Sequence, residues 1–196
     1  MTLADQTAVE ATLKDFEPAL LRIVHGAWAE VRKLPLEAPL EFARTRACLV
    51  QDIMVRRAKA EFADDPRVRM VSRDETVKFV FDEAVIARFK KADASGLGSN
   101  IQTQAVMQFV DQQQELPGLP DVHKIEVLYH LNKLQTQIEH VMVVARDDDQ
   151  MLWDYPLRAG ESAQVVMFPT GQDEPPRGAT IKIRTPDAGH EKKQGE

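Results

Sequence analysis

Cysteine is nearly absent from this chain, which has one in 196 residues, Cys48. A single cysteine cannot form an intramolecular disulfide, and zinc sites built on thiolates need several. Cys48 falls within a helical apolar pattern, so we interpret it as a buried structural thiol. Long apolar runs are absent too, since none approaches the roughly 18 residues that indicate a membrane span. The N-terminal stretch begins acidic and does not resemble a secretory signal, so we expect a cytoplasmic protein without membrane contact.

The chain also lacks an excess of basic residues. It carries 25 Lys and Arg against 31 Asp and Glu, a formal net charge of -6. Proteins bind phosphate backbones mainly by neutralising them, so this composition disfavours a nucleic-acid partner, except through a local basic patch such as Arg88 and Lys90. Residues 96–100, GLGSN, lack the GK[ST] ending of a phosphate-binding loop. We expect no bound cofactor and no metal.

The first part of the chain has helical periodicity. Apolar residues recur at steps of three and four along one stripe of an amphipathic helix: Phe16, Leu20, Ile23, Val24, Ala27, Trp28 and Val31. Pro35 and Pro39 end this helix, because proline lacks the donor that a helix interior needs. A second helix is expected from about Leu40 to Phe62. Residues 16–62 are thus predicted to form a helix pair, after a flexible N-terminus at residues 1–15.

Strand-like segments follow from residue 66 onwards. Three runs rich in β-branched and aromatic residues come first: VRMVS, TVKFVF and AVIARFK. A flexible loop at residues 92–99 and a helix that ends near Gln114 are expected next. Three further strand-like runs follow them: KIEVLYHLN, IEHVMVVAR and QMLWDYPL. We predict an α+β fold, with the helix pair packed on an antiparallel sheet of about six strands and one further helix between the strand groups. Residues 16–158 form this single domain, in which residues 66–158 are mainly sheet. Residues 159–185 are expected to be extended edge segments, and residues 186–196 a disordered tail.

Three histidines lie on neighbouring predicted strands. They are His123, His130 and His140, and Glu126 shares a strand face with His130. Histidine is the commonest general base near neutral pH, and facing side chains of antiparallel strands lie about 5 Å apart. These four residues are therefore candidates for a metal or acid–base cluster. The alternative is that the histidines are scattered over the surface, because the loop lengths do not determine the strand register.

Uncharged polar residues are concentrated between residues 96 and 120. Glutamine is frequent there, and the prolines of PGLP at residues 117–120 restrict the backbone. Pre-organised polar and apolar groups suit a recognition surface, because less entropy is lost on binding. The alternative is a helix with a polar outer face followed by a structured turn. The candidate binding residues of this surface and of the basic patch are Asn100, Gln104, Gln108, Leu119, Arg88 and Lys90.

Several segments together resemble an uncharacterised family of bacterial proteins. They are VIARFKKAD, GSNIQTQ, QQQELPGLP, IEVLYHLN and LWDYPL, and the resemblance covers residues 16–157. Genes of this family lie near regulators with a helix-turn-helix and near a peptidase, a setting similar to mobile-element and toxin–antitoxin modules. The resemblance implies a partner-dependent role in a bacterial cell and supplies no catalytic residues.

The sequence leaves open a favoured function, one alternative and, third, a ligand-binding module between helices and sheet, for which no sequence pattern demonstrates a cavity. The favoured one is a small binding or regulatory protein that engages a bacterial protein partner through the surface between residues 96 and 120, as an effector of a toxin–antitoxin-like or mobile-element module. The alternative is a metal-dependent nuclease or hydrolase that uses the His/Glu cluster on the sheet. Neither the partner's identity nor the oligomeric state follows from the sequence.

Overall fold

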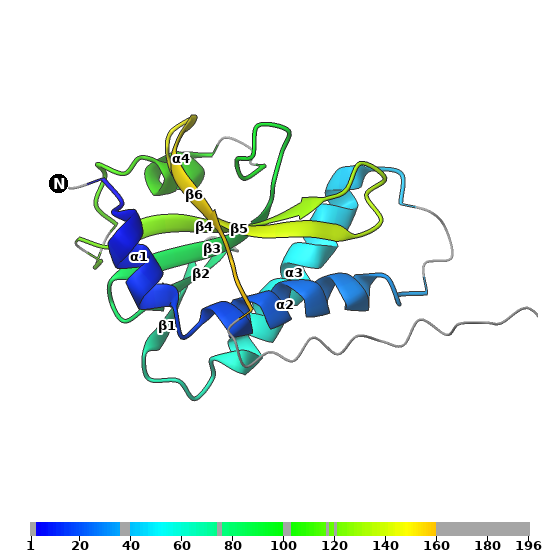
Figure 1. The fold of residues 1–196 in the computed structure, drawn as a ribbon, viewed down its shortest axis with the longest axis horizontal. Helices are drawn as coiled ribbons and strands as arrows, with labels where there is room; N and C mark the ends of the chain where they lie inside the picture. Colours follow the sequence, from blue (N-terminus) through cyan, green and yellow to red (C-terminus); the bar gives the residue numbers. More distant parts are fainter. Residues whose placement is uncertain are drawn as a thin grey trace, which may run out of the picture. The chain divides into compact units, whose positions relative to one another are not determined.

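The computed structural model describes residues 3–35, 40–73, 76–99, 103–116, 118–119 and 121–159, so the predicted edge segments and tail lie outside the described residues. Within these ranges, helices and a six-stranded sheet form the predicted α+β fold (Figure 1). No helix in this part of the chain is both long and apolar enough to cross a membrane. In chain order the elements are α1 (Gln6–Leu13), α2 (Glu17–Val31), α3 (Ala43–Glu61), β1 (Val68–Arg73), β2 (Thr76–Phe81), β3 (Val85–Lys91), α4 (Gln104–Val110), β4 (His123–Leu131), β5 (Ile138–Asp147) and β6 (Gln150–Pro156).

Helix α1 lies in the stretch that the sequence predicted to be flexible, residues 1–15. Asp5 caps its N-terminus, because the Asp5 side chain accepts a hydrogen bond from Thr7 N at 2.9 Å. Val9 and Leu13, one helical turn apart, are fully buried. The prediction of a flexible end was therefore wrong for this helix. An eight-residue helix is marginal by itself, and these apolar contacts with the core stabilise it.

Helices α2 and α3 form the predicted pair. The apolar stripe predicted for α2 is buried along its length, and ion pairs such as Arg22 Nη2 to Glu61 Oε1 at 2.6 Å join the exposed surfaces of the two helices. Helix α3 begins three residues later than expected, because its N-cap Phe42 is extended. Its first turns are exposed or half-buried. Cys48 is exposed with them, so its interpretation as a buried thiol was wrong.

The six strands form one sheet in the order β1-β2-β3-β4-β5-β6. Neighbouring strands are antiparallel, as predicted, except β3 and β4, which run parallel with Val85 opposite His123. Parallel neighbours need a crossover connection instead of a hairpin, and the chain between β3 and β4, with α4, provides it. The expectation of an antiparallel sheet was wrong for this one pair, because side-chain alternation is the same in both strand directions.

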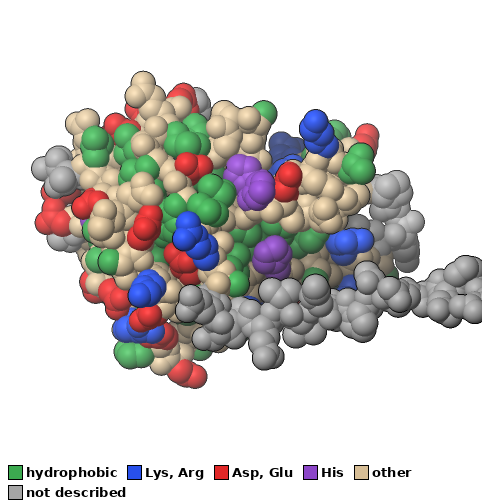
Figure 2. All heavy atoms as spheres, viewed as in Figure 1, with side chains coloured by type: hydrophobic (Ala, Val, Ile, Leu, Met, Phe, Trp, Pro, Cys, Tyr) green, Lys and Arg blue, Asp and Glu red, His purple; other side chains and the backbone are tan. Residues whose placement is uncertain are grey.

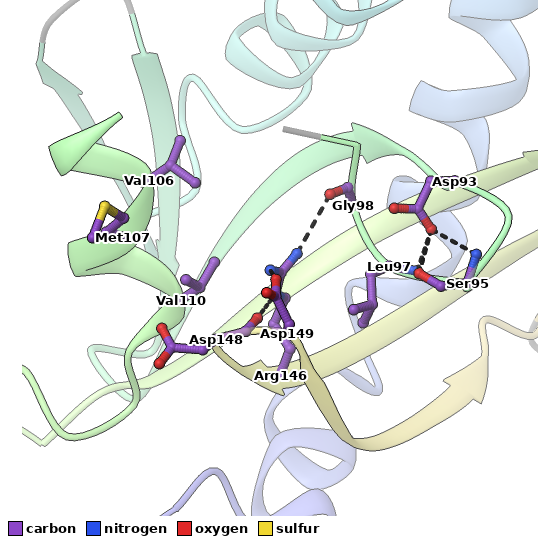
Figure 3. A pocket seen from close by; sticks show the side chains of 10 residues that line it. All are labelled: Asp93, Ser95, Leu97, Gly98, Val106, Met107, Val110, Arg146, Asp148 and Asp149. Atoms are coloured by element: carbon purple, nitrogen blue, oxygen red, sulfur yellow. Dashed lines mark hydrogen bonds and ion pairs between the residues drawn. The ribbon is translucent and has the colours of Figure 1, made fainter. Parts of the chain in front are cut away.

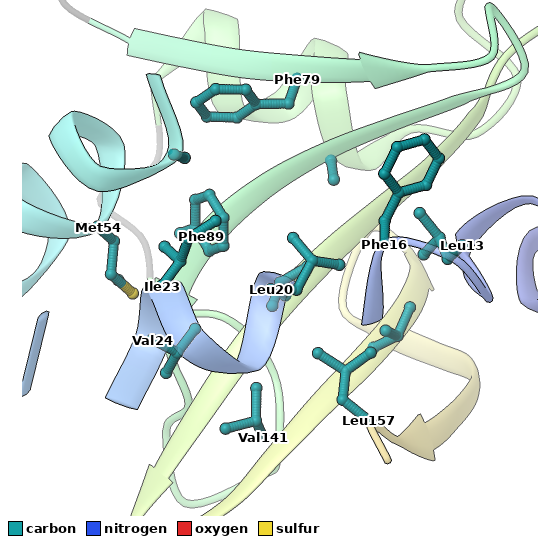
Figure 4. Packing of buried hydrophobic residues seen from close by; sticks show 14 of the residues in the cluster. Leu13, Phe16, Leu20, Ile23, Val24, Met54, Phe79, Phe89, Val141 and Leu157 are labelled. Carbon is teal, nitrogen blue, oxygen red and sulfur yellow. The ribbon is translucent and has the colours of Figure 1, made fainter. Parts of the chain in front are cut away.

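The main hydrophobic core lies between one face of the sheet and helices α1, α2 and α3 (Figures 1 and 4). Alternate residues of β4, namely Ile125, Val127 and Tyr129, belong to this core, as predicted. Aromatic rings from helices and strands meet in it, and the ring centroids of Phe16 and Phe81 lie 4.9 Å apart. Apolar packing on this face therefore supplies most of the burial that stabilises the fold.

The opposite face of the sheet carries the crossover between β3 and β4. Phe109 of α4 packs with Ile86 of β3, and Leu97 of the preceding loop packs with Leu128 of β4. Charged residues are buried on this face, where they alternate with the core residues of the same strands. Within the described ranges the buried charged residues are Arg88, Lys124, Glu126 and Arg146. Buried charges need specific partners, and ionisable groups in such surroundings are concentrated at functional sites.

Candidate functional site

A buried ion pair joins β3 to β4 beneath the crossover. Arg88 Nε and Nη2 donate to Glu126 Oε1 at 2.8 and 2.6 Å, and the two side chains are 3% and 1% exposed. Glu126 Oε2 accepts from Gly98 N at 3.2 Å and lies 3.8 Å from Arg146 Nη1. Burial lowers the pKa of Arg88, Glu126 opposes that shift, and the guanidinium group lies 4.4 Å from the ring centroid of Phe109. One carboxylate thus connects β3, β5 and the loop that leads to α4.

Residue 98 is glycine where the backbone closely approaches Glu126. A Cβ atom at this position would lie 2.5 to 2.7 Å from the carboxylate atoms of Glu126, closer than real Cβ contacts. The absence of a side chain lets Gly98 N reach the carboxylate and donate to it. The second glycine of GLG is therefore required by packing against a buried charge.

The loop at residues 92–99, for which the sequence predicts flexibility, contains hydrogen bonds to Asp93. Asp93 Oδ1 accepts hydrogen bonds from Ser95 N, Ser95 Oγ and Leu97 N at 2.8, 2.6 and 3.2 Å. Partial burial raises the pKa of Asp93, but these hydrogen bonds outweigh it and lower the pKa below its usual value. Gly96 adopts a φ of +83°, which glycine accommodates without strain. These hydrogen bonds constrain the backbone of the loop beside β4.

Lys124 holds the C-terminal end of α4. Its Nζ donates to the carbonyl oxygens of Gln108 at 3.3 Å, of Asp111 at 2.5 Å and of Gln114, and the residue is 3% exposed. The last carbonyl groups of a helix have no partner within the helix and carry partial negative charge. Burial lowers the pKa of Lys124, and the charges of Asp111 and Asp147 oppose that shift. A buried cation thus satisfies the end of α4 and fixes it on the sheet.

Gln112 ties the chain after α4 to β4 and β5. Its Nε2 donates to the carbonyl oxygens of Lys124 at 3.0 Å and Arg146 at 2.8 Å, and its backbone N donates to Asp147 Oδ1 at 2.9 Å. One glutamine of the QQQ run is therefore a structural anchor. Together with Lys124, it determines where α4 lies.

A pocket of about 470 Å³ lies between α4 and the loop at residues 92–99 (Figure 3). In Figure 3 the side chains of α4 line one side, the loop residues line the other, and Arg146 lies between them with the β5–β6 turn. The lining is mixed in character. Its apolar side chains are Leu97, Val106, Met107 and Val110, and its charged side chains are Asp93, Arg146, Asp148 and Asp149.

The guanidinium group of Arg146 is bonded to the protein around this pocket. Its Nε donates to the carbonyl oxygen of Asp148 at 2.5 Å, its Nη1 to that of Gly98 at 3.4 Å, and its Nη2 lies 3.3 Å from Asp149 Oδ1. The side chain is 9% exposed. Arg146 therefore connects the β5–β6 turn to the loop at residues 92–99. Its guanidinium group forms ion pairs with Asp149 and Glu126.

The outer surface of α4 is open to solvent next to the pocket. Met107 is 55% exposed, and the side chains of Gln104 and Gln108 are exposed beside it. Thr103 caps the helix, because its Oγ1 accepts a hydrogen bond from Val106 N at 3.3 Å. The name α4 surface is used below for Gln104, Met107 and Gln108 together with the adjacent pocket.

Two of the predicted binding residues lie on this surface and one does not. Gln104 and Gln108 are exposed on α4, within the predicted stretch. Leu119 is 4% exposed and belongs to the small apolar cluster beneath α4, so its assignment to a binding surface was wrong. Leu119 is an isolated apolar residue, so no helix or strand periodicity indicates whether its side chain points to the core or to solvent.

The predicted basic residues do not form an exposed patch. Arg88 is buried with Glu126, so its assignment to a binding surface was wrong. Lys90 is half-buried, and its Nζ donates to Gln51 Oε1 at 3.3 Å. Burial lowers the pKa of Lys90, and the charge of Arg88 lowers it further. Asn100 lies outside the described residues.

The histidine and glutamate candidates do not converge. His130 and His140 are cross-strand partners with ring centroids 6.5 Å apart, but His123 lies seven residues, or about 23 Å, along β4 from His130. Glu126 lies with Arg88 instead. In the described part of the chain, no three His, Cys, Asp or Glu side chains are placed to hold a metal ion. This arrangement does not favour the hydrolase alternative.

Sequence analysis missed the residues that position the site, Lys124 and Arg146. Lys124 is next to Ile125 in the sequence and Arg146 is next to Ala145, and both apolar residues belong to the main core. Strand alternation therefore places Lys124 and Arg146 on the opposite face of the sheet. The available signal was Leu128, an apolar residue on that same face of β4. It indicates that this face is covered too and that charged residues on it are buried.

Comparisons with protein-family models, with curated proteins and with solved structures gave no match to this chain. Its function is therefore inferred from the geometry and chemistry of its own residues.

Proposed function

We propose that this protein is a binding protein that engages a partner protein through the α4 surface. The observation that carries the proposal is an exposed methionine, Met107, on a helix that Lys124 and Gln112 fix from below. A surface that is already ordered loses less conformational entropy when a partner binds. Methionine adapts to varied apolar partners, and the amides of Gln104 and Gln108 supply donors and acceptors at the edge.

The charge around the pocket favours a basic group in the partner. Asp93, Asp148 and Asp149 line the pocket, whereas Arg146 is already paired with Asp149 and Glu126. A lysine or arginine of the partner would place its aliphatic stem on the apolar side chains of α4 and its cation among the aspartates. The sequence resemblance adds the expectation that such a partner belongs to a bacterial regulatory module of the toxin–antitoxin type.

The experiment compares protein capture from a bacterial lysate by the wild type and by a Gln104→Ala/Met107→Ala/Gln108→Ala variant. All three side chains are exposed, so circular dichroism should show an unchanged fold. We expect a specific partner to be retained by the wild type and lost by the variant. Retention should also weaken when salt is raised from about 50 to about 500 mM, because the aspartate contribution is screened.

The matched control is a Met70→Ala/Leu134→Ala variant, which removes two exposed apolar side chains, 40% and 80% exposed, from β1 and the β4–β5 turn. It should capture the same partner as the wild type. Equal capture by the wild type and the α4 variant, or equal loss in both variants, would contradict the proposed surface.

A further inference from the structure

Trp28 lines a second pocket, and its indole Nε1 is a buried hydrogen-bond donor without a partner among the described residues. The residue is 7% exposed, and its indole Nε1 has less than 1 Å² of accessible surface and no hydrogen-bond partner in the described structure. Trp153 shows the usual arrangement, because its Nε1 donates to the carbonyl oxygen of Ala4 at 2.6 Å. A buried N–H group without an acceptor is destabilising, so the Trp28 donor indicates a position for an acceptor from outside the chain.

The pocket lined by Trp28 has a volume of about 290 Å³, and its lining comes from the end of α2, the start of α3 and the β4–β5 turn. These three segments lie toward the same side of the molecule in Figure 1. This is the space of about ten water molecules at about 30 Å³ each, which suits a ligand with on the order of ten non-hydrogen atoms. One part of the lining is apolar: Trp28, Val31, Leu34 and Leu40. The pocket therefore offers an apolar body of this size a surface to pack on.

The remaining lining is polar, with two arginines beside the uncharged Gln135 and Thr136. Arg32 and Arg46 contribute to it, and neither takes part in an ion pair among the described residues. Arg46 Nη1 donates to the carbonyl oxygen of Gln135 at a long 3.4 Å. Figure 2 shows Lys and Arg side chains, with Asp and Glu side chains among them, on the right of the molecule. No carboxylate of the described residues is paired with either guanidinium group.

The helix ends at this pocket do not cancel its positive charge. Helix α3 starts beside it with Phe42 as N-cap, which supplies no side-chain acceptor, so the partial positive charge of this end is not neutralised by a cap. The C-terminal end of α2 carries the opposite partial charge, about half an elementary charge. Two full guanidinium charges exceed it.

We propose that the Trp28 pocket binds a small amphipathic carboxylate. The apolar body packs on Trp28 and its aliphatic neighbours, and the carboxylate lies between Arg32 and Arg46. One carboxylate oxygen supplies the acceptor that Trp28 Nε1 lacks. A neutral apolar ligand would leave the indole N–H and both guanidinium groups unpaired, and a cationic ligand would be repelled. Because Nε1 has less than 1 Å² of accessible surface, a neighbouring side chain must move for the carboxylate to reach it.

The test follows the two indole N–H resonances of ¹⁵N-labelled protein during titration with octanoate, which has ten non-hydrogen atoms. A Trp28→Phe variant assigns the signals. We expect a saturable shift of the Trp28 signal, with a dissociation constant of about 1 mM or tighter, while the signal of Trp153 stays in place. In the wild type, 1-octanol should bind about tenfold more weakly or worse, because it lacks the charge that pairs with arginine. Octylamine should not bind.

Variants locate the anion. Arg32→Met and Arg46→Met should each weaken octanoate binding about tenfold, whereas Arg22→Met, on α2 but outside the pocket, should not change it. Circular dichroism checks the fold of each variant. Three results would each overturn the proposal: no saturable shift of the Trp28 signal, equal affinity for 1-octanol and octanoate, or unchanged affinity in both arginine variants. The comparison of ligands uses the wild type alone, so it holds even if a variant fails to fold.

Discussion

The two faces of the sheet are built from different chemistry. The face under α1, α2 and α3 is closed by apolar side chains, among them the rings of Phe16, Phe62 and Phe79. The face under α4 buries Arg88 and Glu126 in an ion pair, and Lys124 and Arg146 are buried beside it. Apolar packing has no preferred direction, whereas hydrogen-bonded charges require particular partners at particular distances. We infer that the first face stabilises the fold and the second determines the position of the α4 surface.

The same contrast separates the two pockets. At the α4 surface, Arg146 is bonded to Asp148, Asp149 and Gly98 of the chain itself. At the Trp28 pocket, the indole donor has no acceptor in the described structure. A pocket whose polar groups are already hydrogen-bonded within the chain suits a pre-ordered docking surface. A buried donor without a partner indicates instead a ligand that supplies the acceptor. The difference is why a protein partner is proposed for one and a small carboxylate for the other.

The largest effect is expected from Glu126→Ala. Removing this carboxylate leaves Arg88 buried without its ion-pair partner and Gly98 N without its acceptor. Breaking a buried pair in this way destabilises a protein by about 3–5 kcal/mol. Denaturant unfolding measures the loss, and Arg22→Ala is the control, because it breaks an exposed pair worth about 1 kcal/mol or less. Equal losses in the two variants would show that burial of the charged pair has no energetic importance.

Phe79→Ala tests the apolar face at a fully buried position. We expect a loss of about 3–5 kcal/mol in unfolding free energy, from lost transfer energy and the cavity that remains. In native-state hydrogen exchange, the amides of α4 and residues 92–99 should lose no more protection than the loss of global stability accounts for. Selective loss of protection at α4 in this variant would mean that the apolar face also positions the α4 surface.

Gly98→Ala should give a smaller loss. A Cβ atom there would lie within 2.7 Å of the Glu126 carboxylate, so either the loop or the ion pair must shift. Overpacking of this kind costs about 1–3 kcal/mol, measured by thermal or denaturant unfolding. Ser99→Ala, at the next and exposed position, is the control. An unchanged stability of Gly98→Ala would contradict the close approach at Glu126.

The smallest effect concerns pH. Burial lowers the pKa of His130, and the neighbouring His140 lowers it further. Below the ordinary pKa of about 6.5, the unfolded chain binds a proton at this residue more readily than the folded chain does, so stability is lost as pH falls from there. We expect His130→Gln to lose less stability than the wild type between pH 7 and pH 5. Identical pH profiles would exclude a lowered pKa. His25, whose pKa burial also lowers, is present in both proteins and cancels in the comparison.

Local patterns predicted the elements well, and their long-range relations poorly. The alternation of Ile125, Val127 and Tyr129 placed β4 correctly on the helices, because a strand period depends only on nearby residues. The parallel pairing of β3 with β4 depends on how 31 intervening residues cross the sheet, and no periodicity encodes that. Leu119 was placed on the surface for the same reason, since its burial depends on the packing of the crossover.

The candidate site was predicted in its exposed part only. Gln104 and Gln108 are exposed as expected, because polar residues on a short helix face solvent by default. Arg88 and Glu126 were assigned to separate candidate sites, a basic patch and a histidine cluster, although they form one ion pair. That pairing depends on the register between β3 and β4, in which Arg88 lies opposite Glu126.

The most direct test of the contrast between the two faces is hydrogen exchange on an Arg88→Met/Glu126→Leu variant. Replacing a buried ion pair by apolar residues of similar volume is often neutral or stabilising, so this double variant should unfold with much less loss than Glu126→Ala. We expect the double variant to keep nearly all of its global stability while the amides of α4 and residues 92–99 lose protection, because the Glu126 carboxylate that accepts from Gly98 N is gone. Unchanged protection of these amides at unchanged global stability would contradict the claim that the buried charges position the α4 surface.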